Sequence, residues 1–378
     1  MERDQASKFI NDLLRLMVAR NGSDLFLTAE FPPAIKIDGR VTKVSQQALT
    51  GQHTLALARA IMNDKHAAEF ERSKECNFAI SPTGVGRFRV NAFVQQGQVG
   101  MVLRVIPQTL PTIDSLGLPP VLKDVSMTKR GLVILVGATG SGKSTSLAAM
   151  VDYRNQNSYG HIITIEDPVE FVHPHKNCIV TQREVGLDTE DWASALKNTL
   201  RQAPDVILMG EIRDRETMEH AVAFAETGHL CMATLHANSA NQALDRIINF
   251  FPEERRAQLL MDLSLNMKGM ISQRLLPREE GKGRVAAVEV LLNTPLISEL
   301  IFKGEVAEIK EIMKKSRELG MQTFDQALFD LYEQHLITYE DALRNADSVN
   351  DLRLQIKLSS QRARSADLAS GTEHLTIV

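Results

Sequence analysis

The strongest chemical signal in the sequence is a glycine-rich octet, residues 137–144, which reads GATGSGKS and follows the apolar run 132–136. Its glycines let the backbone curl so that successive N–H groups face one anion, and a helix starting near Lys143 adds its positive end. In such a loop the lysine reaches the β- and γ-phosphates, and the hydroxyl of Ser144 holds Mg²⁺. We therefore predict a nucleoside triphosphate site formed by Gly137, Ala138, Thr139, Gly140, Ser141, Gly142, Lys143, Ser144 and Thr145.

Two acidic residues follow apolar runs that are typical of core strands. Glu166 lies in the segment 163–170, which reads ITIEDPVE, and Glu211 follows the run 206–209. Hydrolysis of a nucleotide needs an acid to organise Mg²⁺ and a base to orient water, and these two glutamates can divide those tasks. Gly210 stands where many phosphate-loop proteins carry aspartate before the acid.

Two histidines flank the predicted strand 230–235. Seven residues of strand place His229 and His236 about 20 Å apart, which argues against a shared metal. A lone histidine is more often structural, but His236 follows the carboxyl end of the strand and is the better candidate for sensing a γ-phosphate.

Three arginines fall on the polar faces of two predicted strands. Apolar residues alternate in 87–92 and 99–106, so Arg87 and Arg89 share one face and Arg104 points outward. They could reach a nucleotide of a neighbouring subunit, although the pattern alone favours a solvated basic face.

The elements that must position these residues fall into two parts. Before residue 107 we expect an amphipathic helix ending before Asn21, a small sheet with a hairpin at Asp38–Gly39, and a second helix from Gln52 to about Arg72. Four prolines in 107–120 indicate a domain boundary. Strands and helices then alternate, which predicts a parallel α/β sheet, interrupted by a hairpin insertion at 170–184. From Pro252 onward we expect mainly helices, at 253–275, 306–319, 323–336 and 348–358.

Composition narrows the class of protein. The 43 basic and 47 acidic residues give a formal charge of −4, which offers no global case for nucleic-acid binding. The three cysteines are far apart and form no zinc or disulfide pattern. Because we see neither a signal peptide nor an apolar run of about 20 residues, we expect a cytoplasmic protein without direct membrane insertion.

Taken together, the motifs resemble the secretion-type hexameric ATPases, and within them the type IV pilus retraction (twitching motility) ATPases. The resemblance spans about residues 5–345. It rests on the octet, the two acidic segments, and the stretches SDL at 23–25, GRFRVN at 86–91, TGH at 227–229, TLH at 234–236, ISQRL at 271–275 and GMQT at 320–323.

The resemblance implies a domain plan and partners. The family plan would give a PAS-like N-terminal domain at 1–106, a Pro-rich linker at 107–120, a RecA-like ATPase core at 121–292, a helical region at 293–360 and a flexible tail at 361–378. It implies a homo-hexamer with ATP and Mg²⁺ between subunits. It also implies a paralogous retraction ATPase and an inner-membrane pilus platform protein as partners, the latter holding the motor at the inner face of the cytoplasmic membrane.

The same resemblance assigns roles to single residues. It makes Glu166 the base that activates water and Glu211 the acid associated with Mg²⁺. It places His229 and His236 near the nucleotide or its interdomain coupling. It also makes Arg89 and Arg104 candidates for delivery in trans and leaves Arg87 undecided.

Two departures refine the resemblance. Residues 295–302 read PLISELIF where many retraction ATPases carry AIRNLIRE, and Phe26 stands where they often carry histidine. With the added tail, these departures favour the accessory paralogue over the principal motor. A nucleotide-binding scaffold of the pilus machine stays open as an alternative. A pilus-assembly or secretion ATPase is disfavoured because its usual tetracysteine zinc element and longer N-terminal region are missing. A nucleic-acid translocase is weaker still.

Overall fold

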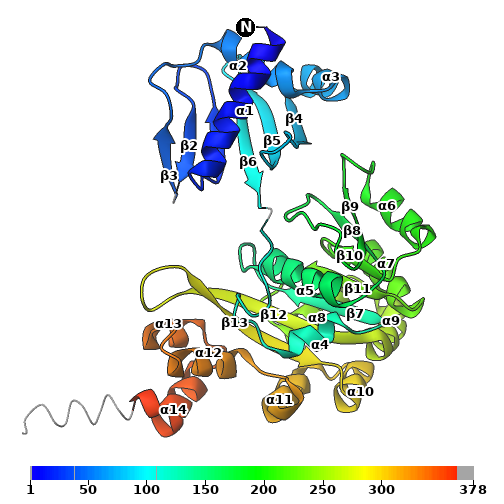
Figure 1. Cartoon of the computed structure of the whole chain (residues 1–378). Helices are drawn as coiled ribbons and strands as arrows, with labels where there is room; N and C mark the ends of the chain where they lie inside the picture. Colours follow the sequence, from blue (N-terminus) through cyan, green and yellow to red (C-terminus); the bar gives the residue numbers. More distant parts are fainter. Residues whose placement is uncertain (1, 38, 108, 364–378) are drawn as a thin grey trace, which may run out of the picture. The chain divides into compact units, whose positions relative to one another are not determined.

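The computed structural model describes residues 2–37, 39–107 and 109–363. The chain divides into two compact units (Figure 1). The first runs to Thr109 and includes residues 170–172, and the second comprises 110–169 and the chain from His173 onward. Each unit is described below by itself.

The first unit is an antiparallel sheet with three helices. Its six strands lie in the order β3-β2-β1-β6-β5-β4 (Figure 1). Leu25, Phe88 and Leu103 are fully buried on one face of this sheet, where Leu14 of the first helix joins them in one hydrophobic core. The elements are α1 (Arg3–Ala19), β1 (Asp24–Leu27), β2 (Ala34–Ile37), β3 (Arg40–Lys43), α2 (Gly51–Ile61), α3 (Asp64–Ser73), β4 (Glu75–Ile80), β5 (Arg87–Gln95) and β6 (Gln98–Ile106).

The single helix predicted from Gln52 to about Arg72 is wrong, because the structure has two helices there. Met62 is extended (φ −83°, ψ 138°) and ends α2. The side chain of Asn63 then accepts a hydrogen bond from the backbone N–H of His66 and caps α3. A break of two residues leaves the apolar spacing almost unchanged, so periodicity alone did not reveal it.

The second unit is a mixed α/β domain, which confirms the predicted fold class. Its seven strands lie in the order β13-β12-β7-β11-β10-β8-β9, and all neighbours are parallel except the edge pair of β12 and β13. Every residue of β7, β10 and β11 is buried, as expected for central strands covered on both faces. Its strands are β7 (Gly131–Val136), β8 (His161–Glu166), β9 (Ile179–Glu184), β10 (Val206–Met209), β11 (Leu230–Leu235), β12 (Met267–Pro277) and β13 (Arg284–Leu292).

The helices of this unit include a C-terminal group that packs on the ends of β12 and β13. Phe324 and Leu352 of that group share a buried cluster with Leu276 and Val285 of the two strands (Figure 1). The α-helices are α4 (Val121–Ser126), α5 (Lys143–Asn157), α6 (Trp192–Thr199), α7 (Arg215–Glu226), α8 (Ala240–Asn249), α9 (Glu253–Asn266), α10 (Pro295–Lys303), α11 (Ile309–Lys315), α12 (Phe324–Glu333), α13 (Tyr339–Asn345) and α14 (Val349–Ser359). Short 3₁₀ turns lie at Leu200–Gln202, Val306–Glu308 and Arg317–Leu319.

Two of the predicted elements in this unit are wrong. The segment 170–184 is no hairpin, because β9 pairs in parallel with β8 and extends the sheet. The predicted helix 253–275 ends at Asn266, where β12 begins, and β13 was also missed. A strand buried on both faces shows no alternation, so its apolar run is easily mistaken for part of a helix.

The predicted linker and the predicted tail both contain residues that contact the second unit in the structure. Ile113 and Leu118, inside the predicted linker 107–120, are buried in a core cluster of the second unit. Arg362, inside the predicted tail 361–378, donates hydrogen bonds to the carbonyl oxygens of Tyr332 and Ile337 at 2.8 and 3.1 Å. Residues 364–378 of that tail lie outside the described residues. Among the described residues, no helix is both long and apolar enough to cross a membrane.

Candidate active site

The glycine-rich loop joins β7 to α5, and two of its glycines have no room for a side chain. A Cβ at Gly137 would lie 2.3 Å from Ser141 Oγ and 2.8 Å from the carbonyl oxygen of Gln273. A Cβ at Gly142, whose φ is +91°, would lie 2.6 Å from Gln273 Nε2. The sequence therefore has glycine where the loop lies closest to β12, and α5 begins at the next residue.

The ammonium group of Lys143 lies inside this loop. Its Nζ donates hydrogen bonds to the carbonyl oxygens of Gly137 and Ala138, at 2.7 and 2.9 Å. Burial lowers the pKa of Lys143, while the nearby Glu211 carboxylate acts in the opposite direction. A buried cation at the amino end of a helix, among turned backbone N–H groups, is a setting that suits the phosphates of a nucleotide. Ser144 and Thr145 follow in the first turn of α5.

The structure brings Glu211 and His236 together. His236 Nε2 lies 3.4 Å from Glu211 Oε1, and Arg213 Nε donates to Glu211 Oε2 at 3.0 Å. Burial, then the charge of Lys143, lowers the pKa of His236, so its imidazole is neutral near pH 7. Lys143, Glu211 and His236 thus form one electrostatic group after the carboxyl ends of β7, β10 and β11, the edge where such sheets bind ligands.

Glu166 ends β8, next to β10. Its Oε1 accepts hydrogen bonds from Thr164 Oγ1 at 2.7 Å and from Gln182 Nε2 on β9 at 3.2 Å. The glycine at position 210 has a packing reason. A Cβ there would lie 3.3 Å from the Cα of Glu166, tighter than an ordinary contact.

His229 does not join this group within one chain. It precedes β11, and its carbonyl oxygen accepts the backbone N–H of Gly131 at the start of β7. Its ring Nδ1 lies 3.0 Å from Thr227 Oγ1 and 3.2 Å from the carbonyl oxygen of Phe224. In a parallel sheet the start of a strand is the edge opposite to the glycine-rich loop. The role of His229 near the nucleotide or in its interdomain coupling stays a prediction.

The two arginines predicted to act in trans lie side by side in the first unit. Arg89 on β5 and Arg104 on β6 are direct cross-strand partners, and Arg104 is also opposite Asp24 on β1. Arg104 Nε donates to Asp24 Oδ1 at 2.7 Å, with the Asp24 side chain 5% exposed. Arg104 thus already has a partner in its own chain.

Gln273 contacts the glycine-rich loop and was not among the residues that we predicted for the site. It is buried on β12, where its Nε2 donates to the carbonyl oxygen of Ser141 at 2.9 Å and its Oε1 accepts from Ser146 Oγ at 2.6 Å. Its neighbours Ser272 and Arg274 are also polar, so no local pattern singled it out. It ties the loop and the first turns of α5 to the neighbouring strand.

A cavity of about 320 Å³ adjoins the loop. No group of three or more His, Cys, Asp or Glu residues among the described ones could hold a metal ion unaided. Magnesium in nucleotide sites commonly takes one or two protein ligands and completes its shell with phosphates and water. The Ser144 hydroxyl and the Glu211 carboxylate fit that role. The cavity is lined by residues 137–141 and by Asn238, Gln273, Arg274, Leu275 and Arg284.

Two known proteins are similar to this chain over most of its length. The chain is 62% identical over 365 residues to the type IV pilus ATPase PilU of Pseudomonas aeruginosa, covering 97% of this chain and 95% of that protein. It is 45% identical over 337 residues to the type IV pilus retraction ATPase PilT of the same organism, covering 89% of this chain and 98% of PilT.

A solved structure and a family model give the same assignment. The crystal structure of the pilus retraction motor PilT with bound ADP matches with a TM-score of 0.86 at 42% identity, over 91% of this chain and 98% of that one. The model of the type II/IV secretion system protein family matches residues 2–344. The predicted resemblance is thereby confirmed, and the chain belongs to the type II/IV secretion system protein family.

Proposed function

We propose that this chain is a Mg²⁺-dependent ATPase that works as a hexameric motor for type IV pilus retraction. The observation that carries the proposal is the group of Lys143, Glu211 and His236 after the carboxyl ends of β7, β10 and β11. The 62% identity to PilU and the 45% identity to PilT support pilus retraction as the process in which the motor works. The higher identity to PilU favours an accessory motor that acts with a paralogous retraction ATPase.

The residues divide the work as follows. The backbone of the glycine-rich loop and Lys143 bind the β- and γ-phosphates, and Ser144 and Glu211 hold Mg²⁺. When bound, the ion neutralises charge on the phosphates. Glu166, held by Thr164 and Gln182, orients the attacking water. His236, neutral near pH 7, lies beside the Glu211 carboxylate and responds to charge at the γ-phosphate.

A neighbouring subunit completes the site in this proposal. Arg89 and Arg104 belong to the first unit, and an arginine delivered in trans to a nucleotide can raise the rate about 10³ to 10⁵-fold. Mixing Arg89→Ala subunits with Glu166→Gln subunits should restore part of the activity, because some interfaces then combine two intact halves. Absence of recovery at every mixing ratio would contradict the trans role.

The cellular role is tested in a deletion strain scored for surface pili and their retraction, with and without the paralogous motor. We expect more surface pili and slower or weaker retraction when the gene is removed. Normal pilus number and normal retraction in both backgrounds would contradict a retraction motor. A motor of this kind is coupled to the membrane through an inner-membrane platform protein rather than through its own insertion.

A nucleotide-binding scaffold of the pilus machine is the second candidate function. Steady-state phosphate release from the purified protein separates the two: a scaffold binds nucleotide with negligible turnover. The pairing of two strand-end glutamates with a glycine-rich loop favours the motor, because a scaffold needs no residue to orient water.

A further inference from the structure

Arg274 connects the loop after β11, beside the cavity at the glycine-rich loop, with the C-terminal helices. It follows Gln273 on β12, so the residue that braces the glycine-rich loop and Arg274 are adjacent in the chain. Its Nη2 donates to the carbonyl oxygen of Asn238 at 3.1 Å, and Asn238 lines the cavity. The same Nη2 donates to Asp347 Oδ1 at 2.7 Å, and Nη1 donates to the carbonyl oxygen of Asn345. One guanidinium therefore contacts both the loop after β11 and the loop between α13 and α14.

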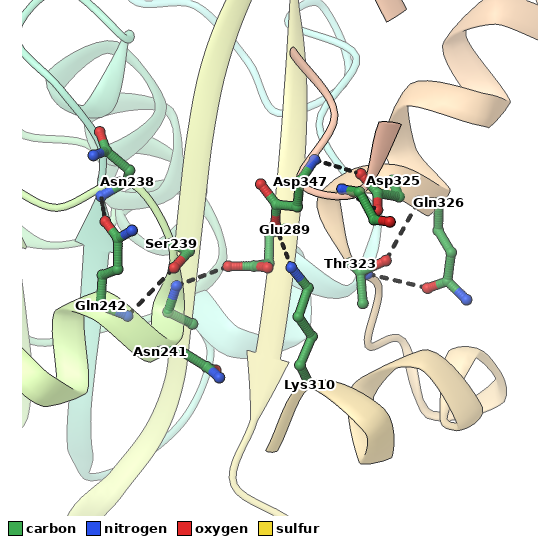
Figure 2. Close-up of polar contacts among 12 residues, drawn as sticks. Asn238, Ser239, Asn241, Gln242, Glu289, Lys310, Thr323, Asp325, Gln326 and Asp347 are labelled. Carbon is green, nitrogen blue, oxygen red and sulfur yellow. Dashed lines mark hydrogen bonds and ion pairs between the residues drawn. The ribbon is translucent and has the colours of Figure 1, made fainter. Parts of the chain in front are cut away.

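Asp347 is the partner that holds Arg274 to the helices. Its carboxylate also pairs with Lys310 of α11, as Figure 2 shows. Its backbone N–H donates to Asp325 Oδ1 of α12 at 2.8 Å, and the N–H of Ser348 donates to Asp325 Oδ2 at 3.1 Å. The loop before α14 is thus fixed to three other elements: β12, α11 and α12.

The Asp347 carboxylate is paired with two cations, Arg274 and Lys310. The side chains of Arg274 and Asp347 are 25% and 17% exposed, so the pair is shielded from water. Hydrogen bonds from Lys310 and Arg274 lower the pKa of Asp347 although burial acts against them. The guanidinium of Arg274 also lies 3.9 Å from the centre of the Phe324 ring, which orients it. Removing either charge leaves the other partly buried with fewer partners, which is unfavourable.

A second connection starts at the amino end of α8. Glu289 on β13 is 2% exposed and accepts the backbone N–H of Ala240, the first residue of α8, at 2.7 Å. Asn241 donates to the carbonyl oxygen of Val306, which lies in the turn before α11. Figure 2 shows Glu289 between this helix start and the Lys310–Asp347 pair. The segment that follows His236 is therefore tied to the C-terminal group at more than one point.

We propose that Arg274 and Asp347 are positioning residues that couple nucleotide binding at the glycine-rich loop to the placement of the C-terminal helices α11 to α14. Nucleotide enters the cavity lined by Asn238 and Arg274, and any shift of Asn238 is passed through the Arg274 guanidinium to the loop at Asn345–Ser348. The inference rests on the proposed nucleotide site but needs no hydrolysis. Because coupling is reciprocal, loosening the C-terminal loop must weaken nucleotide binding as well.

The test uses the full-length protein with ADP as the probe. We expect ADP to slow amide hydrogen exchange at residues 345–352 of the wild type. In Asp347→Asn, which keeps the size of the side chain, that effect should be lost, and ADP affinity should fall about fivefold to tenfold. Lys310→Met removes the partner of the other Asp347 carboxylate oxygen and is a milder change. It should lower the ADP affinity and the protection by ADP to a smaller extent.

Asp330→Asn is the matched control. Asp330 of α12 pairs with Arg317 in the same helical group and has no hydrogen bond to Arg274 or Asp347 among the described contacts. It should leave both the ADP affinity and the ADP-dependent exchange unchanged. A purely structural role of Asp347 would lower the melting temperature but keep the protection by ADP in the folded protein, which would overturn the coupling. If wild-type protein does not bind ADP at all, the proposed nucleotide site fails instead.

Discussion

The Gln273 side-chain amide donates a hydrogen bond to the carbonyl oxygen of Ser141 at 2.9 Å, and this contact joins the glycine-rich loop to β12. The other end of the same amide accepts from Ser146 in α5. The glycine-rich loop and the start of α5 are therefore held by a residue about 130 positions away in the sequence. The side-chain nitrogen of that residue bonds to the loop, and its side-chain oxygen bonds to the helix. The loop's shape is set by β12 as well as by its own glycines.

Gln273→Met should weaken nucleotide binding with little change in the overall fold. The substitution keeps the length of the side chain but leaves the Ser141 carbonyl and the Ser146 hydroxyl without their partner, at a cost of about 1–3 kcal/mol. We expect the dissociation constant for fluorescent ADP to rise about tenfold. Gln258→Met is the control, since Gln258 Nε2 donates to Asp262 Oδ1 within α9. Unchanged ADP affinity in Gln273→Met would contradict the bracing role.

Gln182→Met should reduce turnover more than substrate binding. Gln182 and Thr164 both donate to Oε1 of Glu166, so loss of the amide leaves the carboxylate less well oriented toward water. We expect kcat to fall about tenfold while KM for ATP changes less than twofold, as for an interaction realised in the transition state. Thr181→Val serves as the control, because the hydroxyl of Thr181 lies 2.8 Å from His161 Nε2. A rise in KM with unchanged kcat would count against this role for Glu166.

Arg104→Ala should destabilise the first unit. The Asp24 carboxylate is almost completely buried, and Arg104 is its charged partner, so the variant leaves a buried carboxylate that accepts a hydrogen bond from the Ser23 hydroxyl. We expect a loss of about 1 kcal/mol in unfolding free energy and faster hydrogen exchange in β1 and β6. Arg59→Ala removes a well-exposed pair with Glu71 and should change little. Unchanged unfolding free energy and unchanged hydrogen exchange in Arg104→Ala would contradict the stabilising role of its pair with Asp24.

The free energy of unfolding should fall as the pH is lowered, because of the buried His173. Burial lowers its pKa from 6.5 to about 4, and the imidazole is 7% exposed. The histidine is therefore neutral in the folded protein, and its contribution is complete above pH 6.5. Below that value the unfolded chain takes up a proton that the folded chain does not, so the free energy of unfolding declines until about pH 4, by about 3 kcal/mol in total.

Denaturant titrations of wild type and His173→Asn test this sign. Between pH 7.5 and pH 5 the wild type should lose about 2 kcal/mol more than the variant. Asp152 and Lys176, which act on the pKa of His173 with opposite signs, are unchanged in both proteins. Equal pH slopes for the two proteins would show that His173 titrates normally.

The parts of the fold that could be predicted are those in which local pattern and burial agree. The strands Val206–Met209 and Leu230–Leu235 match their predicted bounds because each is mostly apolar and is buried throughout. The helix after the loop also begins at Lys143 as predicted. The spacing of the glycines likewise identified Lys143, and the apolar runs before them identified Glu166 and Glu211.

The parts that were missed depend on contacts between distant segments. β9 reads as part of an insertion, since only its pairing with β8 makes it a strand of this sheet. β12 loses its alternation because both faces are covered, and Gln273 gains its role only through Ser141 and Ser146. The Arg104–Asp24 pair spans 80 positions, which is why the strand pattern placed Arg104 outward without revealing its partner.

The central claim is that the glycine-rich loop hydrolyses ATP, and phosphate release by the purified protein tests it most directly. We expect Mg²⁺-dependent turnover in the wild type that falls by about a hundredfold or more in Lys143→Ala, because the variant removes the cation aimed at the phosphates. Thermal unfolding of both proteins without nucleotide checks that the variant is folded. Equal rates of phosphate release from wild type and folded Lys143→Ala would contradict the account.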